Sequence, residues 1–118
     1  MYRVAIEQLV KWKDSKNRKP LIIEGARQVG KTWLMKEFGK KCFEDTVYIN
    51  FDSNSTMESL FEVDLDINRL ITGIELYAGK KIDPNKTLLI FDEVQEVPKA
   101  LSSLKYFYEN APEYHIVC

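Results

Sequence analysis

The stretch Leu21-Ile-Ile-Glu-Gly-Ala-Arg-Gln-Val-Gly-Lys-Thr32 determines the expected fold, because an apolar run leads directly into two glycines, a lysine and a hydroxyl. The run Leu21–Ile23 predicts a short strand that is buried on both faces. Apolar residues then recur at helical spacing after Gly30, at Leu34, Met35 and Phe38. Gly39 is expected to cap the end of that helix. The stretch therefore predicts a strand, a glycine turn and a helix.

Residues 25–32 match the pattern G-x-x-x-x-G-K-[ST] of a phosphate-binding Walker A loop. Gly25 and Gly30 allow a close approach of the backbone, so that successive amides can converge on the β-phosphate. Lys31 is expected to reach the β and γ phosphates, and the hydroxyl of Thr32 is expected to ligate Mg²⁺. The predicted nucleotide-binding loop is completed by Ala26, Arg27, Gln28 and Val29.

The stretch Leu88-Leu-Ile-Phe-Asp-Glu93 is the second signal, because four apolar residues lead directly into two carboxylates. The run predicts a buried strand, and open α/β sheets bind ligands at the carboxyl ends of their strands. Alone this pattern is weak, since buried strands often end in surface acids. Together with the glycine loop, it predicts that Asp92 holds Mg²⁺ through water and Thr32, while Glu93 orients or deprotonates the attacking water. The alternative for Glu93 is a solvated surface acid.

The rest of the chain alternates between helical and strand patterns. Amphipathic helices are predicted over Tyr2–Trp12, from Asp66 as N-cap to Gly79, and from about Pro98 with Leu101, Leu104 and Tyr108 facing inward. Further strands are predicted at Val47–Phe51, Leu88–Phe91 and Tyr114–Cys118, with a polar break after Asp52. This alternation predicts an α/β fold, a three-layer αβα core with a mostly parallel sheet.

Composition restricts the class of protein. The 118 residues suit one domain, and their 45% hydrophobic content is enough for a packed core. Seventeen Lys and Arg against 18 Asp and Glu leave a net charge of −1, so no global basic field holds nucleic acid. Cys42 and Cys118 are too few for a disulfide framework or a paired zinc site. No apolar run approaches the roughly 20 residues of a membrane helix, so we expect a cytoplasmic protein with no membrane partner.

Three segments carry a resemblance to a known family: GARQVGKT (25–32), YINFD (48–52) and LLIFDEVQEVPKAL (88–101). Together they resemble a family of prokaryotic AAA-type P-loop ATPases, and the similarity runs from about Tyr2 to Cys118. The resemblance implies an ATPase core that uses ATP or ADP and Mg²⁺, with Asp92 on the metal and Glu93 catalytic. It assigns phosphate and magnesium binding to Gly25, Gly30, Lys31 and Thr32.

The family also implies parts that follow the last predicted strand. Its ATPase module continues into a Gly-Ser sensor, a fifth strand, a helical lid and charge-stabilising arginines, and a nuclease-like domain of unknown function usually follows. The resemblance implies that residues 1–118 are the N-terminal portion of one ATPase domain, incomplete at its C-terminus. It would consist of an amphipathic helix over 1–13, a loop over 14–20 and a truncated core over 21–118. We expect slow turnover and self-association through an open sheet edge, with any nucleic acid or protein partner left to the second domain.

The function that the sequence favours is Mg²⁺-dependent ATP hydrolysis coupled to a conformational change, and three other functions are alternatives to it. A GTPase fits poorly, because the stretch Asp92–Gln95 lacks the expected glycine and Asn85–Leu88 has no acid to read guanine. A small-molecule kinase would use the same loop but needs an acceptor pocket and a lid. A nucleotide-binding or protein-interaction module without turnover also stays open.

Several side chains are expected to be structural rather than functional. We expect Trp12 and Trp33 to pack in the core and His115 to be a packed histidine rather than a metal ligand. The basic stretch from Lys11 to Lys19 is expected to be a solvated loop.

Overall fold

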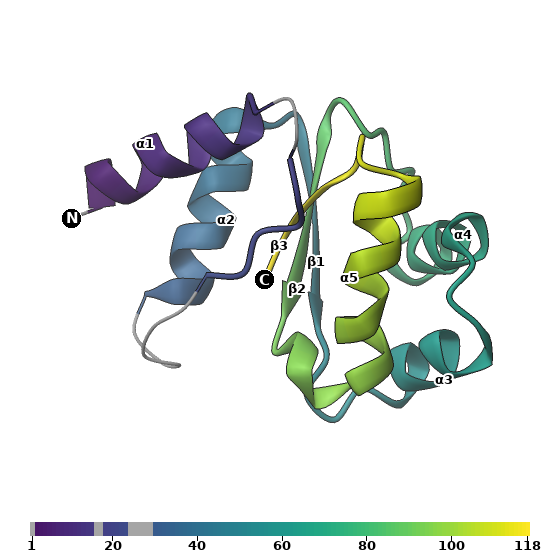
Figure 1. The fold of residues 1–118 in the computed structure, drawn as a ribbon. Helices are drawn as coiled ribbons and strands as arrows, with labels where there is room; N and C mark the ends of the chain where they lie inside the picture. The colour runs from purple at the N-terminus through teal and green to yellow at the C-terminus, as the bar shows by residue number, and fades with distance from the viewer. Residues whose placement is uncertain (1, 16–17, 24–29) are drawn as a thin grey trace.

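The computed structural model describes residues 2–15, 18–23 and 30–118. In chain order, the elements are α1 (Tyr2–Lys13), α2 (Lys31–Cys42), β1 (Asp45–Asn50), α3 (Ser55–Val63), α4 (Ile67–Ala78), β2 (Thr87–Asp92), the short 3-10 helix η1 (Val94–Glu96), α5 (Pro98–Asn110) and β3 (His115–Val117). Strands and helices alternate along much of the chain (Figure 1).

The sheet is parallel, in the order β1-β2-β3. Val117 of β3 is paired with Ile90 of β2 and also forms an isolated parallel bridge with Leu21. Because a strand residue has one neighbour on each side, Leu21 lies on the side of β3 that is away from β2. The α/β fold with a parallel sheet is therefore confirmed.

Helices cover both faces of this sheet (Figure 1). α1 and α2 lie on one face, and α3, α4 and α5 lie on the other. β2 is buried along its whole length, which explains its continuous apolar run. Its side chains alternate between the two cores: Leu88 and Ile90 pack with α1 and α2, whereas Leu89 and Phe91 pack with α3 to α5. This alternation places Asp92 on the α2 side of the sheet.

The prediction that Leu21–Ile23 is buried on both faces is wrong. Ile22 is 53% exposed, and Leu21 and Ile23 are only half-buried. In the described residues this segment has a strand neighbour only in β3, because it lies at the outer side of the sheet. A groove of about 310 Å³ lies beside it. The groove is lined by Gln8, Leu9, Trp12, Leu21, Ile22, Ile23 and Leu34.

Gly39 does not end its helix, contrary to the sequence prediction. α2 continues to Cys42, and Gly39 is buried inside it. A Cβ atom at this position would collide with Thr46 Oγ1 and lie 3.2 Å from Leu88 Cδ2. The glycine is therefore needed for the close approach of α2 to β1 and β2. The other predicted cap, Gly79, is confirmed, with φ 74° at the end of α4.

α3 was missed by the sequence prediction, which expected a polar break at this position. The helix is anchored by the buried Met57 and Phe61, and Asn54 caps it by accepting a hydrogen bond from the Met57 amide at 3.0 Å. The predicted inward face of α5 is also partly wrong, since Leu101 and Tyr108 are exposed. The residues of α5 that are buried are Ala100, Ser103, Leu104 and Phe107.

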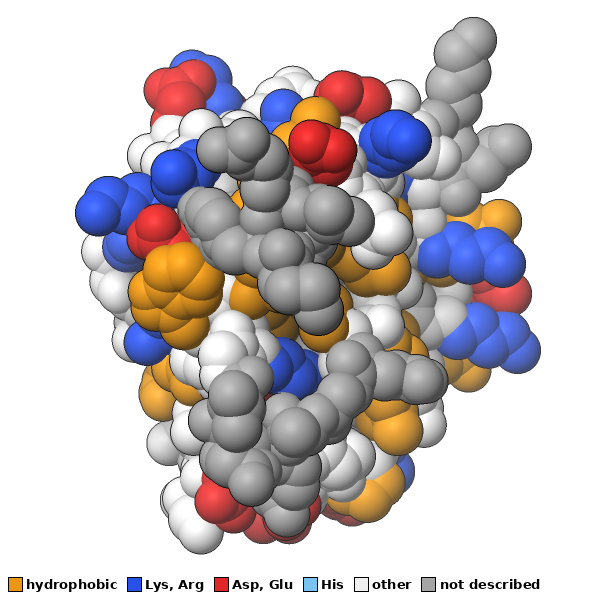
Figure 2. Space-filling view, turned by 90° about the vertical axis from the view of Figure 1, so that its left-hand side faces the viewer, with side chains coloured by type: hydrophobic (Ala, Val, Ile, Leu, Met, Phe, Trp, Pro, Cys, Tyr) orange, Lys and Arg blue, Asp and Glu red, His pale blue; other side chains and the backbone are white. Residues whose placement is uncertain are grey.

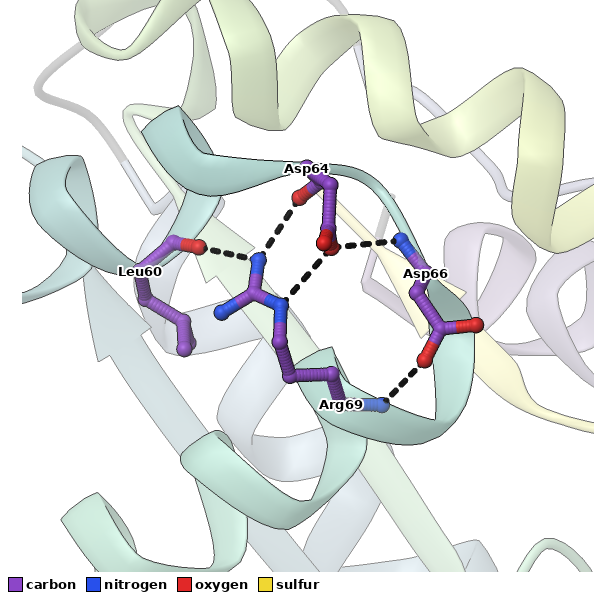
Figure 3. A network of polar contacts seen from close by, with 4 residues as sticks. All are labelled: Leu60, Asp64, Asp66 and Arg69. Atoms are coloured by element: carbon purple, nitrogen blue, oxygen red, sulfur yellow. Dashed lines mark hydrogen bonds and ion pairs between the residues drawn. The ribbon is translucent and has the colours of Figure 1, made fainter.

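Arg69 joins the end of α3 to the start of α4 (Figure 3). Its guanidinium donates to the carbonyl oxygens of Leu60 and Asp64 at 2.6 and 2.7 Å and to Asp64 Oδ1 at 2.7 Å. These bonds satisfy carbonyls that the end of α3 leaves without helical partners. Asp66 caps α4 as predicted, accepting from the Arg69 amide at 3.0 Å. The hydrogen bond from Arg69 lowers the pKa of Asp64.

Two aromatic predictions differ in outcome. Trp12 is half-buried and packs against the core, with its ring 6.1 Å from Phe38 and 5.9 Å from His115. His115 is buried and packed, as predicted. Trp33 is 55% exposed, so its predicted core position is wrong. α2 turns the neighbouring Met35 and Phe38 toward the sheet instead, and this orients Trp33 outward.

The expectation of a purely solvated basic loop is wrong for Arg18. Its guanidinium donates to the carbonyl oxygens of Lys13, Pro112 and Glu113 at 3.0, 2.9 and 3.1 Å. These contacts tie the segment after α1 to the turn before β3. Arg18 therefore connects two parts of the structure that are distant in the sequence.

Candidate functional site

The candidate site lies where the N-terminus of α2 meets the carboxyl ends of β1 and β2. Gly30 precedes α2 with φ 74°, and no side chain caps the helix. The carbonyl oxygen of Gly30 accepts a hydrogen bond from the Leu34 amide at 2.8 Å. Lys31 is the first residue of the helix. A helix start with no side-chain cap presents amide donors and a partial positive charge, which favours an anion.

Part of the predicted loop lies outside the described residues. This applies to Gly25, Ala26, Arg27, Gln28 and Val29. The structure describes the second part of the motif, Gly30 to Thr32, together with the carboxylates of β2.

Thr32 and Asp92 are brought together although they are 60 residues apart in the sequence. Thr32 Oγ1 donates to Asp92 Oδ2 at 2.7 Å. Asp92 is only 4% exposed and ends β2, so the strand carries its carboxylate from the core to the edge of the sheet. A hydroxyl and a carboxylate are hard oxygen ligands, which suit Mg²⁺. The donor set that the sequence predicted for the metal therefore fits that ion.

Tyr48 was not predicted and is the third member of this cluster. Its hydroxyl donates to the same oxygen, Asp92 Oδ2, at 2.7 Å. Burial raises the pKa of Tyr48, and the hydrogen bond to Asp92 raises it further. The phenol consequently stays protonated and remains a donor. The alternation of side chains along β1 could have revealed it, since Tyr48 follows Thr46 on the α2 side of the sheet.

Glu93 follows β2 in the left-handed backbone region, with φ 55°. That conformation is uncommon for a residue other than glycine and is often found at functional sites. Gln95 Nε2 donates to Glu93 Oε1 at 2.6 Å, so a nearby amide orients the carboxylate. Glu93 is half-buried rather than fully solvated. Gln95 is a second contact that the sequence analysis missed, because an amide two residues away carries no pattern of its own.

Two features are absent from the described part of the chain. It contains no group of three or more His, Cys, Asp or Glu side chains placed to hold a metal ion. None of its helices has both the length and the apolar character required to cross a bilayer.

Comparison with known proteins identifies the family. No curated protein and no solved structure matches the chain. A family model described as an AAA domain matches residues 17–118, which is most of the sequence. The matched range includes the glycine loop, Tyr48 and both carboxylates of the candidate site. The chain therefore belongs to this AAA-domain family, whose members are P-loop ATPase-like domains.

Proposed function

We propose that this domain binds adenine nucleotide together with Mg²⁺. The observation that carries the proposal is the 2.7 Å contact between Thr32 Oγ1 and Asp92 Oδ2, beside Lys31 at the start of α2. It combines a phosphate-binding helix terminus with the hard oxygen ligands of a divalent cation. Lys31 would contact the β and γ phosphates, and Thr32 and Asp92 would hold the ion, Asp92 through water. The bound Mg²⁺ would neutralise charge on the phosphates.

The proposal extends to the predicted loop as a whole. Backbone amides from Gly25 to Gly30 would surround the phosphates, with Ala26, Arg27, Gln28 and Val29 lying between the two glycines. A polyphosphate is a favourable ligand for these backbone amide donors and Lys31, because its negative charges accept their hydrogen bonds. We propose adenine over guanine because the segment Asn85–Leu88 has no acid to read guanine.

Titration calorimetry tests binding directly. MgATP and MgADP are expected to bind, and Lys31→Ala is expected to weaken both with little change in melting temperature, since Lys31 is not a core residue. Lys105→Ala, an exposed lysine of α5, is the matched control. Absence of heat with either nucleotide, while circular dichroism shows a folded protein, would overturn the proposal.

We further propose that Glu93 acts on the water that attacks the γ-phosphate. Its support is its place beside Asp92 and its orientation by Gln95. Turnover is expected to be slow, because an arginine that stabilises the transition state contributes about 10³ to 10⁵ in rate and none is assigned in this segment. Phosphate release should fall in Glu93→Gln while nucleotide affinity is kept. Glu96→Gln, at an exposed acid in η1, is the control.

Phosphate release measured beside binding also separates the alternatives. Binding without any release indicates a nucleotide-binding or interaction module, and transfer to a small acceptor indicates a kinase. In the intact protein we propose that hydrolysis drives a conformational change in an attached domain. Self-association through the sheet edge at Leu21–Ile23 and a cytoplasmic location remain part of the same proposal.

A further inference from the structure

Tyr48 lies where its side chain can reach the carboxylate at the end of the neighbouring strand. It packs with the core cluster beneath α1 and α2, on the same side of the sheet as Asp92. The parallel register pairs Asn50 with Asp92, so Tyr48 is two residues before the strand end. The length of a tyrosine side chain spans this offset, and its hydroxyl meets Asp92 Oδ2 at 2.7 Å.

Two hydroxyls thus donate to one carboxylate oxygen, but they have different surroundings. Thr32 belongs to α2 and is expected to contact the metal. Tyr48 belongs to β1, whose backbone is hydrogen-bonded to β2 along its full length. Its bond to Asp92 therefore joins two strands that are fixed relative to each other. A short O–H···O⁻ bond of this kind is charge-assisted and stronger than a neutral one.

The ring of Tyr48 is itself held in position. Lys36 Nζ lies 4.2 Å from the ring centroid. Lys36 is four residues after Thr32, so both side chains project from the same face of α2. The same helix therefore contacts Asp92 directly through Thr32 and packs a cation on the ring that holds Asp92.

We propose that Tyr48 is a positioning residue, whose hydroxyl holds the Asp92 carboxylate in the orientation required for the magnesium–nucleotide complex. The inference rests on the proposed function, because it assigns a role at the same site. Thr32 can then turn its oxygen toward the ion while Asp92 keeps its orientation. A purely structural role would differ, since satisfying a buried oxygen stabilises the fold without changing the response to Mg²⁺.

The test is Tyr48→Phe, which keeps the ring and its contact with Lys36 but removes the hydroxyl. Binding of ATP is measured by calorimetry in EDTA and then at increasing Mg²⁺. Affinity in EDTA is expected to stay within about twofold of the wild type. The Mg²⁺ concentration for half-maximal enhancement is expected to rise about tenfold, because loss of a partner that orients a metal ligand usually lowers metal affinity by 10- to 100-fold.

The control is Tyr106→Phe, which removes the hydroxyl of an exposed tyrosine on α5 and should change neither value. Thermal melting in the absence of nucleotide reports any structural loss separately. An unchanged Mg²⁺ requirement in Tyr48→Phe would overturn the positioning role, as would an equal loss of affinity with and without Mg²⁺. If the folded wild type bound no nucleotide under either condition, the proposed function itself would be wrong and this inference with it.

Discussion

Replacing Gly39 with alanine tests how closely α2 must approach the sheet. Gly39 is buried in the third turn of α2, facing the start of β1. The added Cβ would collide with Thr46 Oγ1 and would lie 3.1 Å from Thr46 Cγ2 and 3.2 Å from Leu88 Cδ2. Thr46 is a short, β-branched side chain whose χ1 is restricted, so it has little freedom to move away from the added atom. The helix, and not only a side chain, is therefore expected to shift.

Two opposing effects determine the change in the free energy of unfolding. Alanine is favoured over glycine by about 1 kcal/mol in a helix interior, which is a gain for α2. Overpacking of a close-packed core costs about 1 to 3 kcal/mol, and this cost applies to Thr46 and Leu88 together. The net expectation is a loss of about 1 kcal/mol, or roughly 4 °C in melting temperature for a domain of this size. Because α2 also carries Lys31 and Thr32, affinity for MgATP should fall as well.

The assay is urea unfolding and thermal melting, with Gly73→Ala as the matched control. Gly73 also lies inside a helix, but the three heavy atoms nearest to an added Cβ all belong to Leu60, a half-buried and more flexible side chain. The change in the free energy of unfolding for Gly73→Ala should be smaller than for Gly39→Ala or of opposite sign. A second comparison places Gly39→Ala in a Thr46→Ala background. Because the obstructing side chain is removed there, the stabilisation expected from the higher helix propensity of alanine should be observed. If Gly39→Ala stabilised the otherwise unchanged chain by the full propensity gain, close packing would not be the reason for this glycine.

Three further predictions concern stability and association. Burial lowers the pKa of His115, so the unfolded chain binds its proton at a higher pH than the folded chain. The free energy of unfolding should therefore be highest above about pH 6.5 and should fall as the pH drops toward 5. In His115→Asn, the free energy of unfolding should depend less on pH over this range. Asp66→Ala removes the N-cap of α4 and should cost about 1 kcal/mol in chemical denaturation, with Asp52→Ala, an exposed residue outside the helices, as the reference. Light scattering over a dilution series should show self-association of the wild type. Ile22→Lys should reduce this self-association, because a charge on an exposed sheet edge disfavours pairing of strands. A wild type that stays monomeric at high micromolar concentration contradicts this prediction.

Much of the fold followed from local patterns. The continuous apolar run of β2 predicted a central strand, and it is buried throughout because it has neighbours on both sides and helices on both faces. The run at Leu21–Ile23 looks similar in sequence but lies at the outer side of β3, so one of its residues faces outward. Sequence pattern does not distinguish a central strand from an outer one, because the difference is the presence of a neighbour.

Helical spacing alone also does not determine which apolar side chains of a helix are exposed. The α5 face was misjudged because Ala100 and Ser103 are small enough to pack closely, whereas Leu101 lies one position off the buried side. Figure 2 shows the α1–α2 side of the molecule, where hydrophobic side chains remain visible among lysines and arginines. Exposed apolar residues of this kind are ordinary on protein surfaces and give no periodic signal.

The sequence by itself identified the family resemblance and the residue types of the site, because a glycine loop followed by Lys31 and Thr32 is a local pattern and so is an apolar strand that ends in Asp92 and Glu93. Only the tertiary structure brought Thr32 within 2.7 Å of Asp92 and added the hydroxyl of Tyr48 to the same oxygen. The physical reason is that these contacts depend on the parallel register of β1 against β2 and on the close packing of α2 permitted by Gly39. Both are set by interactions between segments far apart in the chain, which no local spacing encodes.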